Sequence, residues 1–270
     1  MVEIRLVADA LRVLVPLLYG AVAVGYVAEF YRNRDKHFSW ITTVLAAGIG
    51  FHFLLLATLF FEQNGLPIDT TFKGLLFIAF MVSLLFFGMD RFLGEIRYGA
   101  FLFPVVFAIT SFAAVFLNTG TPLPKQLNSL YFVTHATLLF LAYSCFLLSF
   151  VISCMYLLQH RQIKSHRLGA LFKRLPSLSD MDNSVMRVDA LGLGLFILGT
   201  ATGFLWMEMV VGIPTHISLK IGLASLVLIA YLGEHLLRIG RGWTGQRACV
   251  MSVAGFVFVL VTLLAGRHGF

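Results

Sequence analysis

Eight long apolar blocks dominate the 270-residue sequence and restrict what the chain can fold into. A helix that crosses the hydrocarbon core of a bilayer needs about 20 apolar residues, and each block approaches or exceeds that length. Because backbone groups in lipid must be hydrogen-bonded within the protein, such blocks predict membrane-spanning helices. The blocks are Leu6–Phe30, Trp40–Phe61, Phe72–Gly88, Tyr98–Leu117, Leu130–Gln159, Val188–Val211, Ile217–Leu237 and Ala248–Gly266.

The composition agrees with this interpretation. Hydrophobic residues make up 59% of the chain and charged residues only 12%, whereas a soluble domain carries about 25% charged residues. The mean hydropathy is +0.89. The sequence lacks the alternating segments of about ten residues that form outer-membrane barrels. We therefore predict an all-α, polytopic integral membrane helix bundle of about eight transmembrane helices, forming a single membrane domain over residues 1–270.

The distribution of Lys and Arg predicts the orientation of the chain. Of the 20 basic residues, fourteen fall at one set of loops and helix ends and six at the other. Since basic residues accumulate on the cytoplasmic side, both termini should lie outside. The same bias accounts for the net charge of +7, so a nucleic-acid partner is not expected. The longest polar segment, His160–Ser184, is a cytoplasmic loop too short to bury a core of its own.

Five of the eight histidines lie in or at the ends of the apolar blocks. His52 lies near the middle of the second block and His235 toward the cytoplasmic end of the seventh. His135, His216 and His268 lie at outer helix ends. An ionisable group within a span is costly and marks a functional candidate, although a neutral histidine that donates to a neighbouring carbonyl is the alternative.

This arrangement favours two possible ligand pairs, one on each side of the membrane. Neutral imidazole is a good ligand for haem iron, and two imidazoles complete a six-coordinate site. Zinc is disfavoured because no further ligands follow at short spacing. The segment "GLGLF" (Gly192–Phe196) lies inside a span without a strand–turn–helix context, which predicts close helix packing rather than a nucleotide site.

Polar groups also crowd into the stretch "TGFLWMEMVVGIPTHISLK" (Thr202–Lys220). We expect Trp206, Glu208, His216 and Lys220 to lie where two outer helix ends meet across a short turn. His216 and Lys220 share one helical face, and Glu208 is placed to pair with Lys220 across the turn. The alternative is an interfacial ion pair with Trp206 anchored in the aromatic belt.

Three segments, in this order, resemble one family. They are "LYFVTHATLLFLAYSCFLLSFVISCMYLLQHRQIK" (Leu130–Lys164), "LGLGLFILGTATGFLWME" (Leu191–Glu208) and the stretch His216–Gly266, which contains a G-W-x-G-x-R turn at Gly242–Arg247. Together they resemble the haem-handling cytochrome c assembly proteins of the CcsA/CcmC type, and among these the shorter HemX/YpjD-like members.

The resemblance implies roles for individual residues. His135 is similar to the family's outer haem-ligand histidine, with His268 standing for the second outer ligand. His235 and His52 resemble the inner pair. Trp206, with His216, stands in what looks like a reduced form of the family's tryptophan-rich haem platform, whose closing basic residue is Lys220. The other tryptophans and the Asp of that platform, W-G-x-x-W-x-W-D, are missing here.

Three functions stay open. The first is a non-enzymatic protein of the bacterial inner membrane that binds haem and assists cytochrome c biogenesis, with cytochrome c maturation proteins as partners. The second is a HemX-like regulator that contacts an enzyme of tetrapyrrole synthesis through its cytoplasmic loop. The third is a small-solute transporter lined by His52, Asp189, Glu208 and Glu234. An enzyme is not expected, because no paired carboxylates and no nucleophile–base motif occur.

Overall fold

The chain is helical throughout the part that the structure describes. The computed structural model describes residues 2–32, 39–93, 96–117, 128–166, 169, 172, 174–211 and 219–265, and these ranges contain no strand. Seven of the helices found there are long and apolar enough to cross a membrane. The shorter α4, Gly99–Val115, has 17 residues and is equally apolar. The prediction of a polytopic membrane helix bundle is confirmed.

The helices fall into two compact units. Unit 1 comprises residues 1–133 and 268–270, and unit 2 comprises residues 134–267. Whether the chain folds as one membrane domain stays a prediction. Unit 1 contains α1 (Val2–Arg32), α2 (Ser39–Gln63), α3 (Thr71–Leu93), the short 3₁₀ turn η1 (Ile96–Tyr98) and α4, while unit 2 contains most of α5 (Leu130–Lys164), α6 (Leu178–Trp206), the π-helical turn η3 (Met207–Val211), α7 (Leu219–Arg241) and α8 (Gln246–Ala265).

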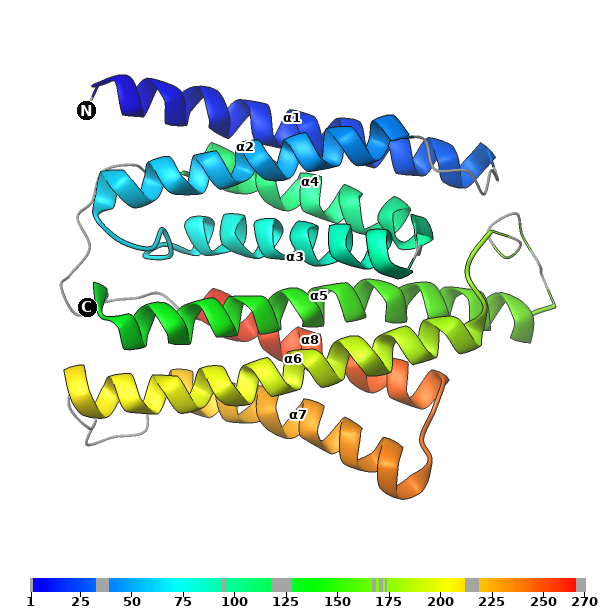
Figure 1. Ribbon diagram of the computed structural model, residues 1–270. Helices are drawn as coiled ribbons and strands as arrows, with labels where there is room; N and C mark the ends of the chain where they lie inside the picture. The colour runs from blue at the N-terminus through cyan, green and yellow to red at the C-terminus, as the bar shows by residue number, and fades with distance from the viewer. Residues whose placement is uncertain are drawn as a thin grey trace. The chain divides into compact units, whose positions relative to one another are not determined.

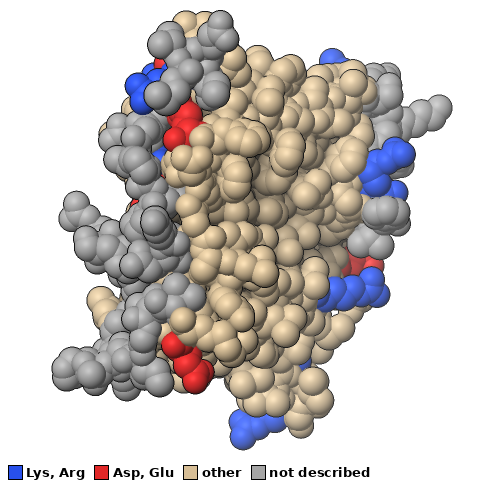
Figure 2. All heavy atoms as spheres, turned by 60° about the vertical axis from the view of Figure 1, so that its left-hand side comes forward, with Lys and Arg blue, Asp and Glu red and all other residues tan. Residues whose placement is uncertain are grey.

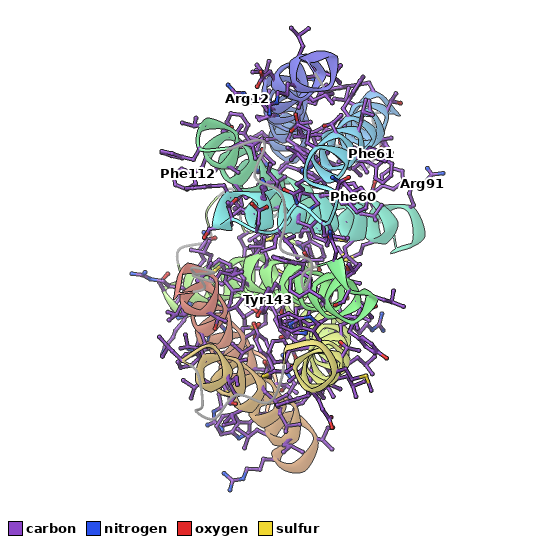
Figure 3. The ribbon with its side chains drawn as sticks, turned by 90° about the vertical axis from the view of Figure 1, so that its left-hand side faces the viewer. Arg12, Phe60, Phe61, Arg91, Phe112 and Tyr143 are labelled. Atoms are coloured by element: carbon purple, nitrogen blue, oxygen red, sulfur yellow. The ribbon has the colours of Figure 1, made fainter. Side chains whose placement is uncertain are left out.

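In unit 1, four helices lie side by side and alternate in direction (Figure 1). Their core is aromatic: the Tyr26 and Phe103 rings stack 5.4 Å apart, and Phe86 meets both rings edge-on. Gly99 permits this packing, since a Cβ there would lie 2.9 Å from Tyr26 and Phe86. Other rings, including Phe61 and Phe112, project from the outer surface of the unit as lipid-facing side chains do (Figure 3).

In unit 2, α5 and α6 pack closely along a stripe of glycines. A Cβ at Gly192 would lie 2.7 Å from Phe146, and one at Gly199 would lie 2.9 Å from Leu139. Gly199 lies seven residues after Gly192 on α6, while its contact Leu139 lies seven residues before Phe146 on α5. The two helices are therefore antiparallel and in a fixed register. Small residues allow such close approach in membranes. The close packing predicted for the "GLGLF" segment is confirmed at Gly192, whereas Gly194 faces open space.

Helix α6 begins ten residues before the predicted block. The Ser177 hydroxyl caps the helix by accepting from the Asp180 N–H at 3.1 Å and donating to the Asp180 carboxylate at 2.5 Å. Such reciprocal caps start helices. The interpretation of His160–Ser184 as one loop was wrong at both ends, because hydropathy reports the lipid-embedded part of a helix and not its polar extensions.

Charged side chains lie at the helix ends. Figure 2 shows a broad surface of uncharged residues between the Lys, Arg, Asp and Glu side chains at its edges. In unit 2 we call one end the basic end, which the last turns of α5 and α7 and the first turns of α6 and α8 form. The exposed basic residues there are Arg161, Lys164, Arg187, Arg241 and Arg247. This agrees with the charge bias, while the orientation in the membrane stays a prediction.

Candidate functional site

The half-buried His135 lies at the end of unit 2 opposite the basic end, one turn into α5. Its Nδ1 lies 2.7 Å from the carbonyl oxygen of Gly199 on α6. A carbonyl oxygen can only accept, so Nδ1 carries the proton and donates it. The lone pair of the neutral ring is therefore on Nε2. Histidines that bind metals are commonly held in this way, with the other ring nitrogen donating to a backbone carbonyl.

Two further residues of α6 shape the surroundings of the His135 ring. A Cβ on Gly203 would lie 2.5 Å from the ring, so this glycine leaves the space that the imidazole fills. Trp206, at the end of α6, lies nearly parallel to the imidazole, with ring centroids 6.4 Å apart and an interplanar angle of 11°. The structure thus brings together His135 and Trp206, both of which the family resemblance names as haem-binding candidates.

The helix continues beyond Trp206 as the π-helical turn η3. Such turns are rare and occur frequently at functional sites. Glu208 in this turn is exposed. The predicted Glu208–Lys220 ion pair cannot be placed, since the Lys220 side chain lies outside the described part, as do His216 and His268.

His235 belongs to the basic end of unit 2. It precedes Arg238 by one turn of α7, and Arg238 binds Asp182 on α6 at 2.9 Å. Asp182 and Gly199 are 17 residues apart on α6, which is about 25 Å of helix. His135 and His235 therefore cannot bind the same iron, in agreement with the different depths expected for them.

His52 lies in unit 1 and is completely buried. Its Nδ1 lies 3.1 Å from the Tyr19 hydroxyl of α1, and the Phe80 ring of α3 meets it edge-on at 5.5 Å. Its Nε2 has no hydrogen-bond partner among the residues described. His52 is thus an imidazole at the middle of α2 in an aromatic shell, and one of its nitrogens makes no hydrogen bond to the described residues.

Sequence reasoning missed two features of this region. The first is the pair Gly199 and Gly203, whose G-x-x-x-G spacing on an apolar helix is a signal of close packing. The second is the buried network around Arg238, which bridges Asp182 on α6 and Glu234 on its own helix, each at 2.9 Å. The signal in the sequence was weak, because Asp182 and Arg238 both lie just outside the predicted apolar blocks and only Glu234 lies within one.

Comparison with known proteins places these residues in a wider context. The family described as cytochrome c assembly protein matches residues 70–268, which include His135, Trp206 and His235. Protein HemX of Brevibacillus brevis is 30% identical over 239 residues, covering 86% of this chain and 84% of its own.

Relatives of lower identity are named either CcsA or HemX. Cytochrome c biogenesis protein CcsA of Mesostigma viride is 22% identical over 235 residues, covering 78% of this chain and 77% of its own. Protein HemX of Bacillus subtilis is 21% identical over 252 residues, covering 91% and 90%. Because the family match spans most of the helical bundle, this multi-pass membrane protein belongs to the cytochrome c assembly protein family.

Proposed function

We propose that this protein binds haem through Nε2 of His135 and presents it for cytochrome c biogenesis. The observation that carries the proposal is the hydrogen bond from His135 Nδ1–H to the Gly199 carbonyl. It fixes the ring orientation and leaves the lone pair on the nitrogen that an iron would bind. Neutral histidine is a common haem ligand.

The surroundings of His135 fit a haem in chemical terms. Trp206 lies beside His135 with its ring nearly parallel to the imidazole, and aromatic side chains are typical walls of apolar cofactor sites. Gly203 keeps the ring in its place on α6. The haem itself would supply the iron and the vinyl groups that a cytochrome c receives. This chain's part is to bind and orient the cofactor, so we propose no catalytic group.

The names of the relatives support this assignment in a second way. CcsA of Mesostigma viride is named a cytochrome c biogenesis protein and aligns with 78% of this chain. We extend that role to this protein, with the bacterial inner membrane as its location and cytochrome c maturation proteins as its partners. His216 and His268, which lie outside the described residues, stay candidate haem ligands from the sequence alone, as do His52 of unit 1 and His235 of unit 2.

The first experiment is an absorption spectrum of the full-length protein, purified in detergent from haem-replete cells. Wild type should show a Soret band that the His135→Ala variant loses. His160→Ala is the matched control, because His160 lies at the other end of the same helix and stacks on Tyr156. A colourless wild type, or an undiminished band in His135→Ala, would reject the proposal.

The His235→Ala variant tests which end of unit 2 binds the haem. If haem binds at His135 alone, this variant keeps the full Soret band, since Gly199 beside His135 and Asp182 at the basic end are about 25 Å apart along α6. A band lost in His235→Ala and kept in His135→Ala would move the site to the basic end. The far-UV circular dichroism of each variant shows whether it is still folded.

A second function is favoured by the exposed charge of the basic end. Arg161, Lys164, Arg187, Arg241 and Arg247 gather there on four helices, and positive surfaces steer acidic partners. A HemX-like regulator that captures a tetrapyrrole-synthesis enzyme would use this surface. The test is total cellular porphyrin and haem in cells carrying Arg161→Gln with Lys164→Gln. Unchanged flux would reject this alternative.

A further inference from the structure

A buried acid in unit 2 takes no part in the proposed haem site. Asp189 lies on α6 with no solvent exposure. Within the described part of the chain neither carboxylate oxygen makes a well-aligned hydrogen bond, although the Ser149 and Ser252 hydroxyls lie beside it. An ionised carboxylate without partners in a membrane interior is among the costliest arrangements a protein can hold, so this side chain requires an explanation.

The network of Arg238 does not neutralise Asp189. The Arg238 Nε donates to Glu234 and its Nη1 donates to Asp182, each at 2.9 Å. Asp182 is seven residues before Asp189 on the same face of α6, about 10 Å closer to the basic end. The guanidinium therefore already binds two carboxylates. If Asp189 were ionised, the single positive charge of Arg238 would be accompanied by three negative charges, those of Asp182, Glu234 and Asp189.

The antiparallel packing of α6 and α7 determines which residues face Asp189. The Asp182–Arg238 bond fixes the register, so a residue seven positions after Asp182 on α6 faces the residue seven positions before Arg238 on α7. Asp189 is then level with Tyr231, and Glu234 lies between the levels of Tyr231 and Arg238. The Tyr231 ring stacks on Phe146 of α5 with centroids 3.7 Å apart, which closes this level to lipid.

Hydroxyl groups from the other two helices border the same place. Ser149 of α5 and Ser252 of α8 lie next to Asp189, and their oxygens are 3.0 Å apart. One of the two hydroxyl protons is used between them, so a single one is left for the carboxylate. The titratable and charged groups around Asp189 are Cys145 from α5 and Tyr231, Glu234 and Arg238 from α7, while α8 contributes the Ser252 hydroxyl.

We propose that Asp189 is a proton-binding site within the membrane, holding one proton as a neutral carboxylic acid. The bound proton removes the uncompensated charge, and its O–H gives Asp189 a donor for the neighbouring Glu234, whose Oε2 has no partner among the described residues. Glu234 stays ionised, because its other oxygen accepts from the guanidinium. The proton arrives from the Asp182 end of α6, where the Asp182 carboxylate is 16% exposed.

A metal ion is a less suitable occupant of this place. The described residues contain no group of three or more His, Cys, Asp and Glu side chains able to hold one. A proton needs only one carboxylate oxygen and one acceptor, and both are present. Acids that carry protons within membrane spans form the relays of pumps and transporters.

The test is infrared spectroscopy of the full-length protein in lipid nanodiscs at neutral pH. A protonated carboxyl has a C=O stretch separate from the carboxylate bands, and exchange into D₂O shifts it. Wild type should show this band, and Asp189→Asn, which keeps the shape of the side chain, should lose it. Asp180→Asn is the control, because Asp180 is an exposed acid on the same helix.

A second variant makes the assignment specific. Glu234→Gln should keep the band but shift its frequency, because the acceptor of the Asp189 proton is altered. Loss of the band in Glu234→Gln with its retention in Asp189→Asn would overturn the proposal, as would the absence of any protonated carboxyl band in wild type. The far-UV circular dichroism of each variant serves as a check on folding that does not depend on haem binding.

Discussion

His135 Nδ1 and the carbonyl oxygen of Gly199 lie 2.7 Å apart and join α5 to α6 at the end of unit 2 opposite the basic end. This single bond ties three properties together. It holds the imidazole against the glycine at position 203, keeps the ring nearly parallel to Trp206, and leaves the lone pair on Nε2. The haem-binding proposal therefore depends on the packing of α6 as much as on the histidine.

Gly203→Ala should weaken haem binding although the residue cannot itself bind iron. The added methyl would meet the His135 ring at 2.5 Å and displace it from the Gly199 carbonyl. Loss of the group that orients a metal-bound histidine typically weakens metal binding by about 10–100-fold. The measurement is a haem titration followed at the Soret band. Gly194→Ala is the control, since nothing lies within 4 Å of its Cβ position, and equal affinities in the two variants would contradict the prediction.

Tyr19→Phe should destabilise unit 1. The Tyr19 hydroxyl lies 3.1 Å from Nδ1 of the buried His52, and removing it leaves a ring nitrogen without a partner. An unsatisfied buried polar group costs about 1–3 kcal/mol. We expect a lower midpoint in thermal or denaturant unfolding in detergent. Tyr131→Phe, at a 40% exposed position, should leave the midpoint unchanged. An unchanged unfolding midpoint for Tyr19→Phe would mean that this hydrogen bond does not contribute to the stability of unit 1.

Arg238→Gln should be far more harmful than the loss of a surface arginine. The change leaves the carboxylates of Glu234 and Asp182 without the cation that both contact. Breaking a buried ion pair from one side costs about 3–5 kcal/mol. Arg241→Gln removes an exposed arginine one turn later and should cost little. The comparison is made by unfolding in the same detergent, and similar midpoints for the two variants would count against a structural role of the network.

Gly245→Ala should destabilise the turn between α7 and α8 more than Gly242→Ala does. Both glycines have a left-handed backbone, with φ of 65° and 62°, which costs a residue with a Cβ about 1–2 kcal/mol. Only at Gly245 would the new methyl also meet the Tyr156 hydroxyl, at 2.6 Å. The melting temperatures should therefore fall in the order wild type, Gly242→Ala, Gly245→Ala. The reverse order of the two variants would show that the Tyr156 contact is relieved at no cost.

Hydropathy located the helices well because a helix in lipid satisfies its backbone hydrogen bonds internally. Each apolar block therefore reports its own secondary structure without reference to neighbours, and the starts of α2, α3, α4 and α5 lie within one residue of the predicted blocks. The largest departure is at α6, whose first ten residues are mostly polar and owe their helical structure to the Ser177 cap rather than to lipid. Composition and charge bias likewise predicted a membrane protein, because both are totals over the whole chain and do not depend on which residues contact one another.

Side-chain partners depend on another kind of information. His135 was a candidate because of its residue type, its position at a helix end and the family resemblance, but its partner is the backbone carbonyl of Gly199, and any α6 residue has such a carbonyl. Which one it meets follows from the register of α5 against α6, set by the glycines that let the helices approach. In the same way, Asp189 was visible as an acid in an apolar block, but its lack of a cation follows from Arg238 lying two turns away and binding other acids. Pairing between helices is a long-range property, and a local pattern in one helix does not contain it.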